Sequence, residues 1–313
     1  MPWQAVQLVL VALLTWAACA FYTLRLNPEV AFYRHGAVVK RGWVQKLDHE
    51  HKSKFLIYGG SSCAFAIDGE RMWQKSGLPM ANLGLGAGMG AKVLTEFALQ
   101  ALRTGDTLIV ALEPDLLTGK IELEPLGVQF SLAAGNPVLL QDRGRMEWLA
   151  ALLELRPGSY HFFTLLGKIV SRQPLHRYSH GDFQPSGWQR AVARRQFSGP
   201  PPLRPHLSIE GRNWLAYIRD ECARRGVRVA YALPWGYCPV EKLENFQRVN
   251  RTILREISEF IPVLRDTRLG AHTVQGDYAD TEWHLTAGGA ALRTDDLAQQ
   301  IQSWRMWPRS ELQ

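Results

Sequence analysis

Cysteine is scarce in this sequence, with only four residues among 313. Their spacing matches none of the patterns typical of zinc or iron–sulfur sites, so we expect no metal and no cofactor. Cys222 and Cys238 flank an expected strand, and an oxidising compartment would allow them to form a disulfide. Two buried free thiols are the favoured interpretation, because unpaired cysteine is among the most buried residue types.

Signatures of nucleic-acid binding are also lacking, since no helix-turn-helix, zinc-finger or RNA-binding-sheet motif occurs. Lys and Arg number 36 against 29 Asp and Glu, and this net charge of +7 suits anionic lipid surfaces, anionic polymers or nucleic acid equally well, so the charge alone does not distinguish them. Because these motifs are lacking, we expect no nucleic-acid partner. A hydrophobic fraction of 46% excludes general disorder, and no internal repeat or low-complexity tract occurs.

Charged residues are absent from residues 2–24, and the run from Val6 to Leu24 is almost wholly apolar. This length approaches the ~20 residues needed to cross a bilayer, which predicts a signal anchor or transmembrane helix over 1–25. The triplet Ala18-Cys19-Ala20 is a candidate cleavage site, so whether the anchor is cleaved stays open. No Lys or Arg precedes the run, which weakly opposes export under the positive-inside rule.

The rest of the chain alternates short apolar runs with amphipathic segments. A polar juxtamembrane stalk is expected over 26–50, followed by a folded domain over 51–313. Apolar runs predict strands at 54–58, 78–83, 106–112, 227–233 and 261–264. Helical periodicity predicts helices at 93–102, 209–224, 243–260 and 286–304. This alternation indicates an α/β domain of three layers, with helices on both faces of a parallel sheet.

Residues 118–205 break this alternation and are interpreted as a helical insertion that covers the sheet edge or the site. A helix is expected near residues 146–155 within it. The segment from Arg172 to Arg204 is rich in aromatic residues, His and Arg. Its basic side chains suit anionic glycans or lipid headgroups, and a solvated basic face is the alternative.

Two adjacent serines follow the first expected strand. Ligands of parallel sheets bind beyond the carboxyl ends of the strands, and the serines are at such an end. Gly59 and Gly60 precede Ser61 and Ser62, and glycine permits the tight turn that exposes a nucleophilic hydroxyl. An ordinary glycine-serine turn is the alternative interpretation.

A carboxylate and an imidazole lie together near the end of the chain. Asp280 precedes His284 by four residues, a spacing that lets the carboxylate accept the Nδ1 hydrogen and fix the tautomer of a general base. A surface Asp beside a structural His is the alternative.

A glycine-rich loop follows the second expected strand and contains Asn82, Gly84, Gly86 and Gly88. Glycine N–H groups approach a developing oxyanion closely, and an asparagine side chain adds a donor. Close packing of the loop on a helix, or phosphate binding, are the alternatives. The loop lacks the spacing and the Lys of a P-loop.

In combination, these motifs resemble the SGNH (GDSL-like) hydrolase superfamily, and most closely its membrane-anchored envelope branch of O-acyltransferases and acetyl-esterases. The resemblance covers about 55–115 and 226–300, and implies a flavodoxin-like αβα fold. It implies that Ser61 is the nucleophile, His284 the general base and Asp280 its orienting partner. The Ser61 N–H and an N–H from Gly84–Gly88 would then form the oxyanion hole.

The resemblance also implies a location and partners. We expect a single-pass protein of the bacterial inner membrane with a periplasmic domain. Its expected activity is ester hydrolysis or O-acyl transfer on an envelope carbohydrate or lipid-linked polymer, with a membrane-bound O-acyltransferase as a candidate partner. An inactive scaffold in exopolysaccharide assembly is the main alternative, and a flavodoxin-like nucleotide binder is a weaker one.

Several positions depart from the family pattern. Gly60 replaces the usual aspartate before the nucleophile, so Ser62 becomes an alternative nucleophile under a one-residue shift. Glu113 and Asp115 stand where many members carry an asparagine, and are interpreted as a solvated or Arg-paired loop, with metal binding or orientation of a donor as the alternative. The aromatic residues Trp235, Tyr237 and Trp283 are candidates for stacking on sugar rings or for closing an apolar lid.

Overall fold

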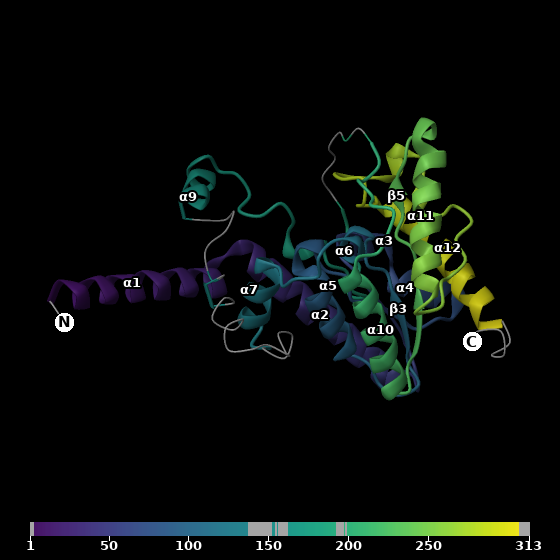
Figure 1. Cartoon of the computed structure of the whole chain (residues 1–313), viewed down its shortest axis with the longest axis horizontal. Helices are drawn as coiled ribbons and strands as arrows, with labels where there is room; N and C mark the ends of the chain where they lie inside the picture. Colours follow the sequence, from purple (N-terminus) through teal and green to yellow (C-terminus); the bar gives the residue numbers. More distant parts are fainter. Residues whose placement is uncertain are drawn as a thin grey trace.

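The structure is a computed structural model that describes residues 3–136, 152–153, 155, 162–191, 197 and 199–306. It is an α/β protein with one apolar N-terminal helix that projects from the sheet domain (Figure 1). The helix expected near 146–155 lies almost wholly outside the described residues. The parallel strands of the main sheet are β1 (Phe55–Tyr58), β2 (Met80–Asn82), β3 (Thr107–Val110) and β4 (Arg228–Tyr231).

The strands pair in the order β2-β1-β3-β4, with every neighbouring pair parallel. The run expected as a fifth strand at 261–264 forms only one parallel bridge, between Tyr231 and Val263, so that prediction is corrected to a single pairing at the β4 edge. A second sheet pairs β5 (Gly236–Tyr237) with β6 (Ala271–His272), also in parallel.

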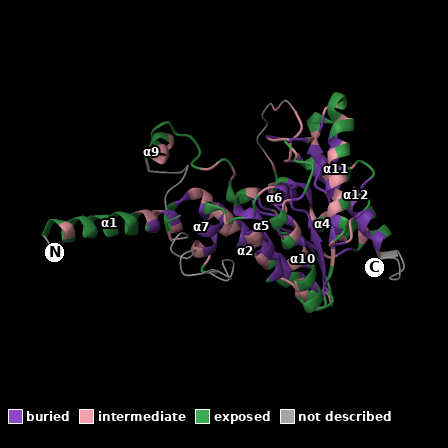
Figure 2. Cartoon of the chain, viewed as in Figure 1, coloured by how far each residue is buried: buried purple, intermediate pink, exposed green. Residues whose placement is uncertain are grey.

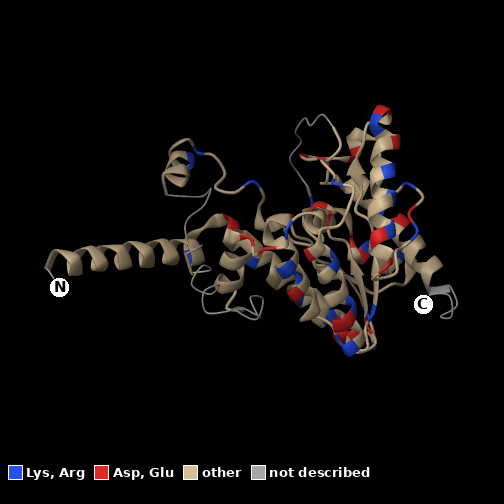
Figure 3. Cartoon of the chain, in the orientation of Figure 1, with Lys and Arg blue, Asp and Glu red and all other residues tan. Residues whose placement is uncertain are grey.

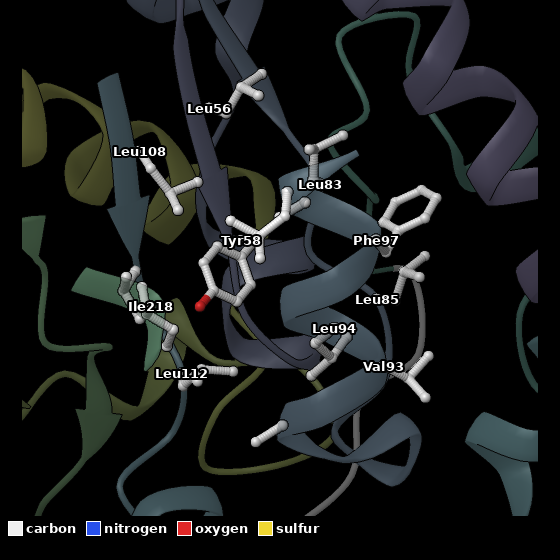
Figure 4. Close-up of a cluster of buried hydrophobic side chains, with 14 of the residues drawn as sticks. Leu56, Tyr58, Leu83, Leu85, Val93, Leu94, Phe97, Leu108, Leu112 and Ile218 are labelled. Carbon is white, nitrogen blue, oxygen red and sulfur yellow. The ribbon is translucent and has the colours of Figure 1, made fainter. Parts of the chain in front are cut away.

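Helices cover both faces of the main sheet. Leu56 and Tyr58 of β1 join one apolar cluster, whereas Phe55 and Ile57 join another, as the two-residue period of a strand requires. The longer helices that bury side chains in the first cluster are α2 (Pro28–Glu50), α5 (Gly90–Leu99), α7 (Pro125–Ala133), α10 (Ile209–Arg224) and α11 (Leu243–Ser258). Figure 4 shows Tyr58, Phe97 and Ile218 within this cluster.

The opposite face of the sheet is covered by α3 (Ser61–Ala66), α4 (Gly69–Ser76) and α12 (Ala287–Met306). Shorter helical elements of the chain are η2 (Ala87–Met89), α6 (Asp115–Thr118), η5 (His180–Asp182), η6 (Val240–Lys242) and η7 (Gln275–Asp277). The helix α9 (Phe162–Val170) belongs to the insertion and lies away from the sheet (Figure 1).

The N-terminal helix α1 (Trp3–Phe21) continues through the π-helical turn η1 (Tyr22–Leu26). Together they form a 24-residue helical segment that is long and apolar enough to cross a membrane, and an 18-residue stretch of it has a mean hydropathy of 2.0. At 1.5 Å per residue its length is about 36 Å, against roughly 30 Å for the hydrocarbon core of a bilayer. Figure 2 shows that α1 is almost wholly exposed, and Figure 3 shows no charge along it.

Residues 26–50 differ from the polar stalk that the sequence led us to expect. They form α2, which Asn27 caps by accepting hydrogen bonds from the N–H groups of Glu29 and Val30. Phe32, Val44 and other side chains of α2 are buried. Lys40 is buried as well, and its ammonium donates hydrogen bonds to the carbonyl oxygens of Asn82 and Gly187. The segment is therefore part of the folded domain.

Candidate functional site

The turn after β1 places Ser61 at the start of helix α3. A backbone carbonyl and a side-chain carboxylate lie close to the two glycines of this turn, which leaves no room for a Cβ atom at either position. A Cβ atom on Gly59 would lie 2.1 Å from the carbonyl oxygen of Ala111, and one on Gly60 would lie 2.5 Å from Oε2 of Glu113. Glycine is the residue that fits such close approaches.

Glu113 holds this turn from the end of β3. Its Oε2 accepts a hydrogen bond of 2.9 Å from the Gly60 N–H, and its Oε1 accepts one of 2.9 Å from the Ser62 N–H. Burial raises the pKa of the Glu113 carboxyl, and interactions with the side chain and the N–H of Ser62 oppose the rise. The interpretation of Glu113 as part of a solvated or Arg-paired loop is therefore wrong, because only 2% of the residue is exposed. Asp115, by contrast, is exposed.

His284 and Asp280 are paired as the sequence spacing predicts. The Nδ1 of His284 lies 2.8 Å from Oδ1 of Asp280. An antiparallel bridge between Tyr278 and Leu285 closes the loop that carries both residues. With Nδ1–H donated to the carboxylate, Nε2 of His284 carries the lone pair that a general base requires.

The insertion adds two side chains to this pair that sequence reasoning missed. The hydroxyl of Tyr178 donates a hydrogen bond to Oδ2 of Asp280 and lies 3.0 Å from Nδ1 of His284. Arg177 forms an ion pair with the same carboxylate, at 2.7 Å from Nη2 to Oδ2. The only signal in the sequence is that both residues belong to the aromatic and basic stretch of the insertion.

These contacts set the charge of Asp280. Burial by itself would raise the pKa of its carboxyl, but hydrogen bonds from His284 and Tyr178 and the charge of Arg177 outweigh burial, and the pKa is lowered. The carboxylate is therefore ionised at neutral pH. The ring of Phe65 stacks on the imidazole of His284 at 4.2 Å between centroids, which further restricts the orientation of the imidazole.

Ser61 and His284 line the same cavity, which has a volume of about 240 Å³. Gly86 and Gly88 of the glycine-rich loop line it too, as do apolar and aromatic side chains that include Tyr33, Phe65 and Leu126. Ser62 does not line this cavity. It is 2% exposed, and its hydroxyl is buried on the side of Glu113.

The hydrogen-bonding groups of Asn82 and Gly84 bind other parts of the protein and do not face the cavity. The Asn82 amide donates hydrogen bonds to the carbonyl oxygens of Cys63 and Ile67 at 2.9 and 2.7 Å, and its Oδ1 accepts one of 2.8 Å from the Gly84 N–H. The expectation that these two residues supply oxyanion donors is therefore not supported by their hydrogen bonds. They connect the glycine-rich loop to helix α3.

The aromatic candidates lie elsewhere. Trp235 is 1% exposed and stacks on His272 at 4.8 Å between centroids. Trp283 is half-buried beside Gly236, and Tyr237 packs on Tyr278. None of these three aromatic candidates lines the cavity of Ser61 and His284.

The remaining sequence expectations concern cysteines and basic residues. Cys222 and Cys238 are free and buried, which confirms the favoured interpretation. Of the basic residues between Arg172 and Arg204, Arg177 is bound to Asp280, whereas Arg194 and Arg195 lie outside the described residues. Within the described ranges, no group of three or more His, Cys, Asp or Glu side chains is arranged to hold a metal ion.

Comparison of the chain with protein-family models, curated proteins and solved structures finds no match.

Proposed function

We propose that this protein is a membrane-anchored, SGNH-like serine esterase or O-acyltransferase that acts on an envelope carbohydrate or a lipid-linked polymer. One observation carries the proposal: Ser61 and His284 line one cavity, while Asp280 binds the ring nitrogen of His284 that the reaction does not use. This arrangement supplies a nucleophile, a base and an orienting carboxylate.

In the proposed reaction, Nε2 of His284 accepts the proton of the Ser61 hydroxyl as Oγ attacks the ester carbonyl carbon. The Ser61 N–H and N–H groups of the loop at Gly86 and Gly88 donate hydrogen bonds to the resulting oxyanion. His284 then returns the proton to the alcohol oxygen as the C–O bond breaks, which leaves the acyl group on Ser61. Attack by water completes hydrolysis, and attack by an acceptor hydroxyl completes acyl transfer.

The position of the cavity supports a substrate that is reached at a membrane surface. Glu29 and Tyr33 of α2 line it, and α2 begins two residues after the apolar segment ends at Leu26. A lipid-linked polymer, or an acyl group delivered by a membrane-bound O-acyltransferase, would reach such a site without leaving the bilayer surface. The proposed location is the bacterial inner membrane, with the sheet domain in the periplasm.

A second candidate function is an inactive scaffold that binds polysaccharide in the same cavity. The hydrogen bonds of Asn82 and Gly84 favour it, because two expected oxyanion donors are used within the fold. Fewer free donors mean weaker stabilisation of the tetrahedral intermediate.

Labelling with a fluorophosphonate probe separates the two functions. We expect the detergent-solubilised full chain to be labelled, and Ser61→Ala to abolish labelling. Ser62→Ala is the matched control, because the adjacent hydroxyl is buried away from the cavity and its loss should leave labelling intact. Absence of labelling in folded wild-type protein would favour the scaffold, and labelling that survives in Ser61→Ala would refute the assigned nucleophile.

A further inference from the structure

Helix α9 of the insertion exposes an apolar surface that the proposed reaction does not use. Leu166, Ile169 and Val170 are 44%, 59% and 75% exposed, and none of the residues 163–170 is buried. Leu153 and Leu175, on either side of α9 in sequence, are 66% and 42% exposed. Contiguous exposed apolar residues of this kind are rare on proteins surrounded only by water, and they mark contact with a membrane or a partner.

Two hydrogen bonds connect the insertion to the apolar N-terminal helix. The indole N–H of Trp16 donates to the carbonyl oxygen of Leu152 at 3.1 Å, and the hydroxyl of Thr23 donates to that of Leu155 at 3.4 Å. Trp16 lies about 15 Å along the helix from Leu26, at 1.5 Å per residue. With Leu26 at the edge of a hydrocarbon core of roughly 30 Å, Trp16 lies at the midplane and Thr23 lies about 5 Å inside the core, so the insertion meets α1 in the half of the bilayer nearest the sheet domain.

The position and charge of α9 agree with this placement. Figure 1 shows α9 on the same side of the sheet domain as α1, level with the part of α1 that is nearer the domain. The sequence from 155 to 181 contains basic residues but no Asp or Glu. In Figure 3 the described part of this stretch carries blue but no red. Basic residues beside an apolar helix suit the anionic headgroups of a membrane surface.

We propose that α9 is a second membrane-docking element, which lies in the boundary between headgroups and acyl chains of the leaflet nearest the sheet domain. The inference rests on the proposed anchoring of the chain by α1. It also connects the bilayer to the site, because Arg177 and Tyr178 follow α9 closely in the sequence and both bind Asp280. The docked helix then fixes the start of the segment that holds the carboxylate in place.

Spin labels on the full chain in nanodiscs of phosphatidylcholine and phosphatidylglycerol test the proposal. The label is placed at Ile169→Cys, with Val170→Cys as an independent second position. Leu13→Cys in α1 reports on the span, and Leu292→Cys, 51% exposed on α12, is the control far from α1. All variants carry Cys19→Ser, and the other three cysteines are buried.

We expect labels at Ile169→Cys and Val170→Cys to gain accessibility to oxygen and to lose accessibility to a water-soluble nickel chelate, relative to Leu292→Cys. Labels at both α9 positions that match Leu292→Cys, while Leu13→Cys faces lipid, would overturn the docking of α9 alone. A Leu13→Cys label in water would instead overturn the proposed anchoring. Protection of α9 that appears only when a nanodisc holds two copies would show that a second chain, rather than lipid, covers it.

Discussion

The hydroxyl of Tyr178 is one of two groups through which the insertion holds the His284–Asp280 pair, and Tyr178→Phe removes this hydroxyl alone. The variant keeps the ring contacts with Phe32 and Phe65, at 6.0 and 5.1 Å between centroids. A hydrogen bond to an ionised group contributes roughly 1.5–3 kcal/mol. His284 and Arg177 still bind the carboxylate in this variant. We therefore expect the free energy of unfolding to decrease by an amount near the lower end of this range, about 1–2 kcal/mol.

The pH dependence of this loss follows from the lowered pKa of Asp280. A carboxyl whose pKa is lower in the folded state adds stability above its unfolded pKa of about 3.9, and that stability disappears as the pH falls through the folded pKa. Tyr178 is one of the groups that lower this pKa. We therefore expect the acid unfolding of Tyr178→Phe to begin at a higher pH than that of the wild type.

Urea unfolding in detergent measures both effects. Combining Tyr178→Phe with Asp280→Asn gives a double-mutant cycle, in which we expect a coupling energy of about 1 kcal/mol. Tyr237→Phe is the control, because its ring packs on Tyr278 away from the carboxylate, and it should stay within about 0.5 kcal/mol of the wild type. Additive effects of Tyr178→Phe and Asp280→Asn would refute the assigned hydrogen bond.

Three further substitutions test the surroundings of the site by denaturation. Gly60→Ala places a Cβ 2.5 Å from Oε2 of Glu113 and should lower the free energy of unfolding by about 1–3 kcal/mol. Gly42→Ala is its control: a Cβ at this helical position meets no atom within 4 Å, so the variant should raise the free energy of unfolding by about 0.5–1 kcal/mol. Glu113→Gln replaces one acceptor oxygen with an amide donor that faces a backbone N–H, and it should lower the free energy of unfolding by about 1–3 kcal/mol. An unchanged free energy of unfolding would contradict the hydrogen bonds from the N–H groups of Gly60 and Ser62. Burial lowers the pKa of Lys40 to about 7, so wild-type stability should rise between pH 7 and 10 while the unfolded state alone holds this proton. Lys40→Met should remove that rise.

The strands of the main sheet could be predicted because their burial is two-sided. Runs such as 106–112 are apolar on both faces, and β3 lies inside that run with all four residues buried. The stalk prediction failed for the opposite reason. Only one face of α2 is buried, so its charged residues dominated the interpretation of the segment, and the buried ammonium of Lys40 finds its carbonyl acceptors only in the tertiary structure.

In the site, too, contacts within one short segment could be predicted from the sequence, whereas contacts between distant segments could not. Asp280 and His284 share one short loop, so their spacing predicted their contact. Arg177 and Tyr178 come from an insertion without periodicity, and no local pattern indicates which carboxylate they bind. Glu113 was misinterpreted because its partners are distant in sequence. They are the N–H groups of Gly60 and Ser62, which lie in the turn after β1, the strand beside β3.

The contact between Gly60 and Glu113 gives a physical reason to treat two departures from the SGNH pattern as one change. Gly60 stands where the resemblance places an aspartate, and the carboxylate of Glu113 occupies the space that any side chain at this position would enter. That carboxylate accepts hydrogen bonds from the N–H groups on both sides of Ser61. Since β1 and β3 are direct neighbours in the sheet, the turn is held by strand pairing rather than by a local aspartate. Glycine at position 60 is therefore no argument against a reactive Ser61.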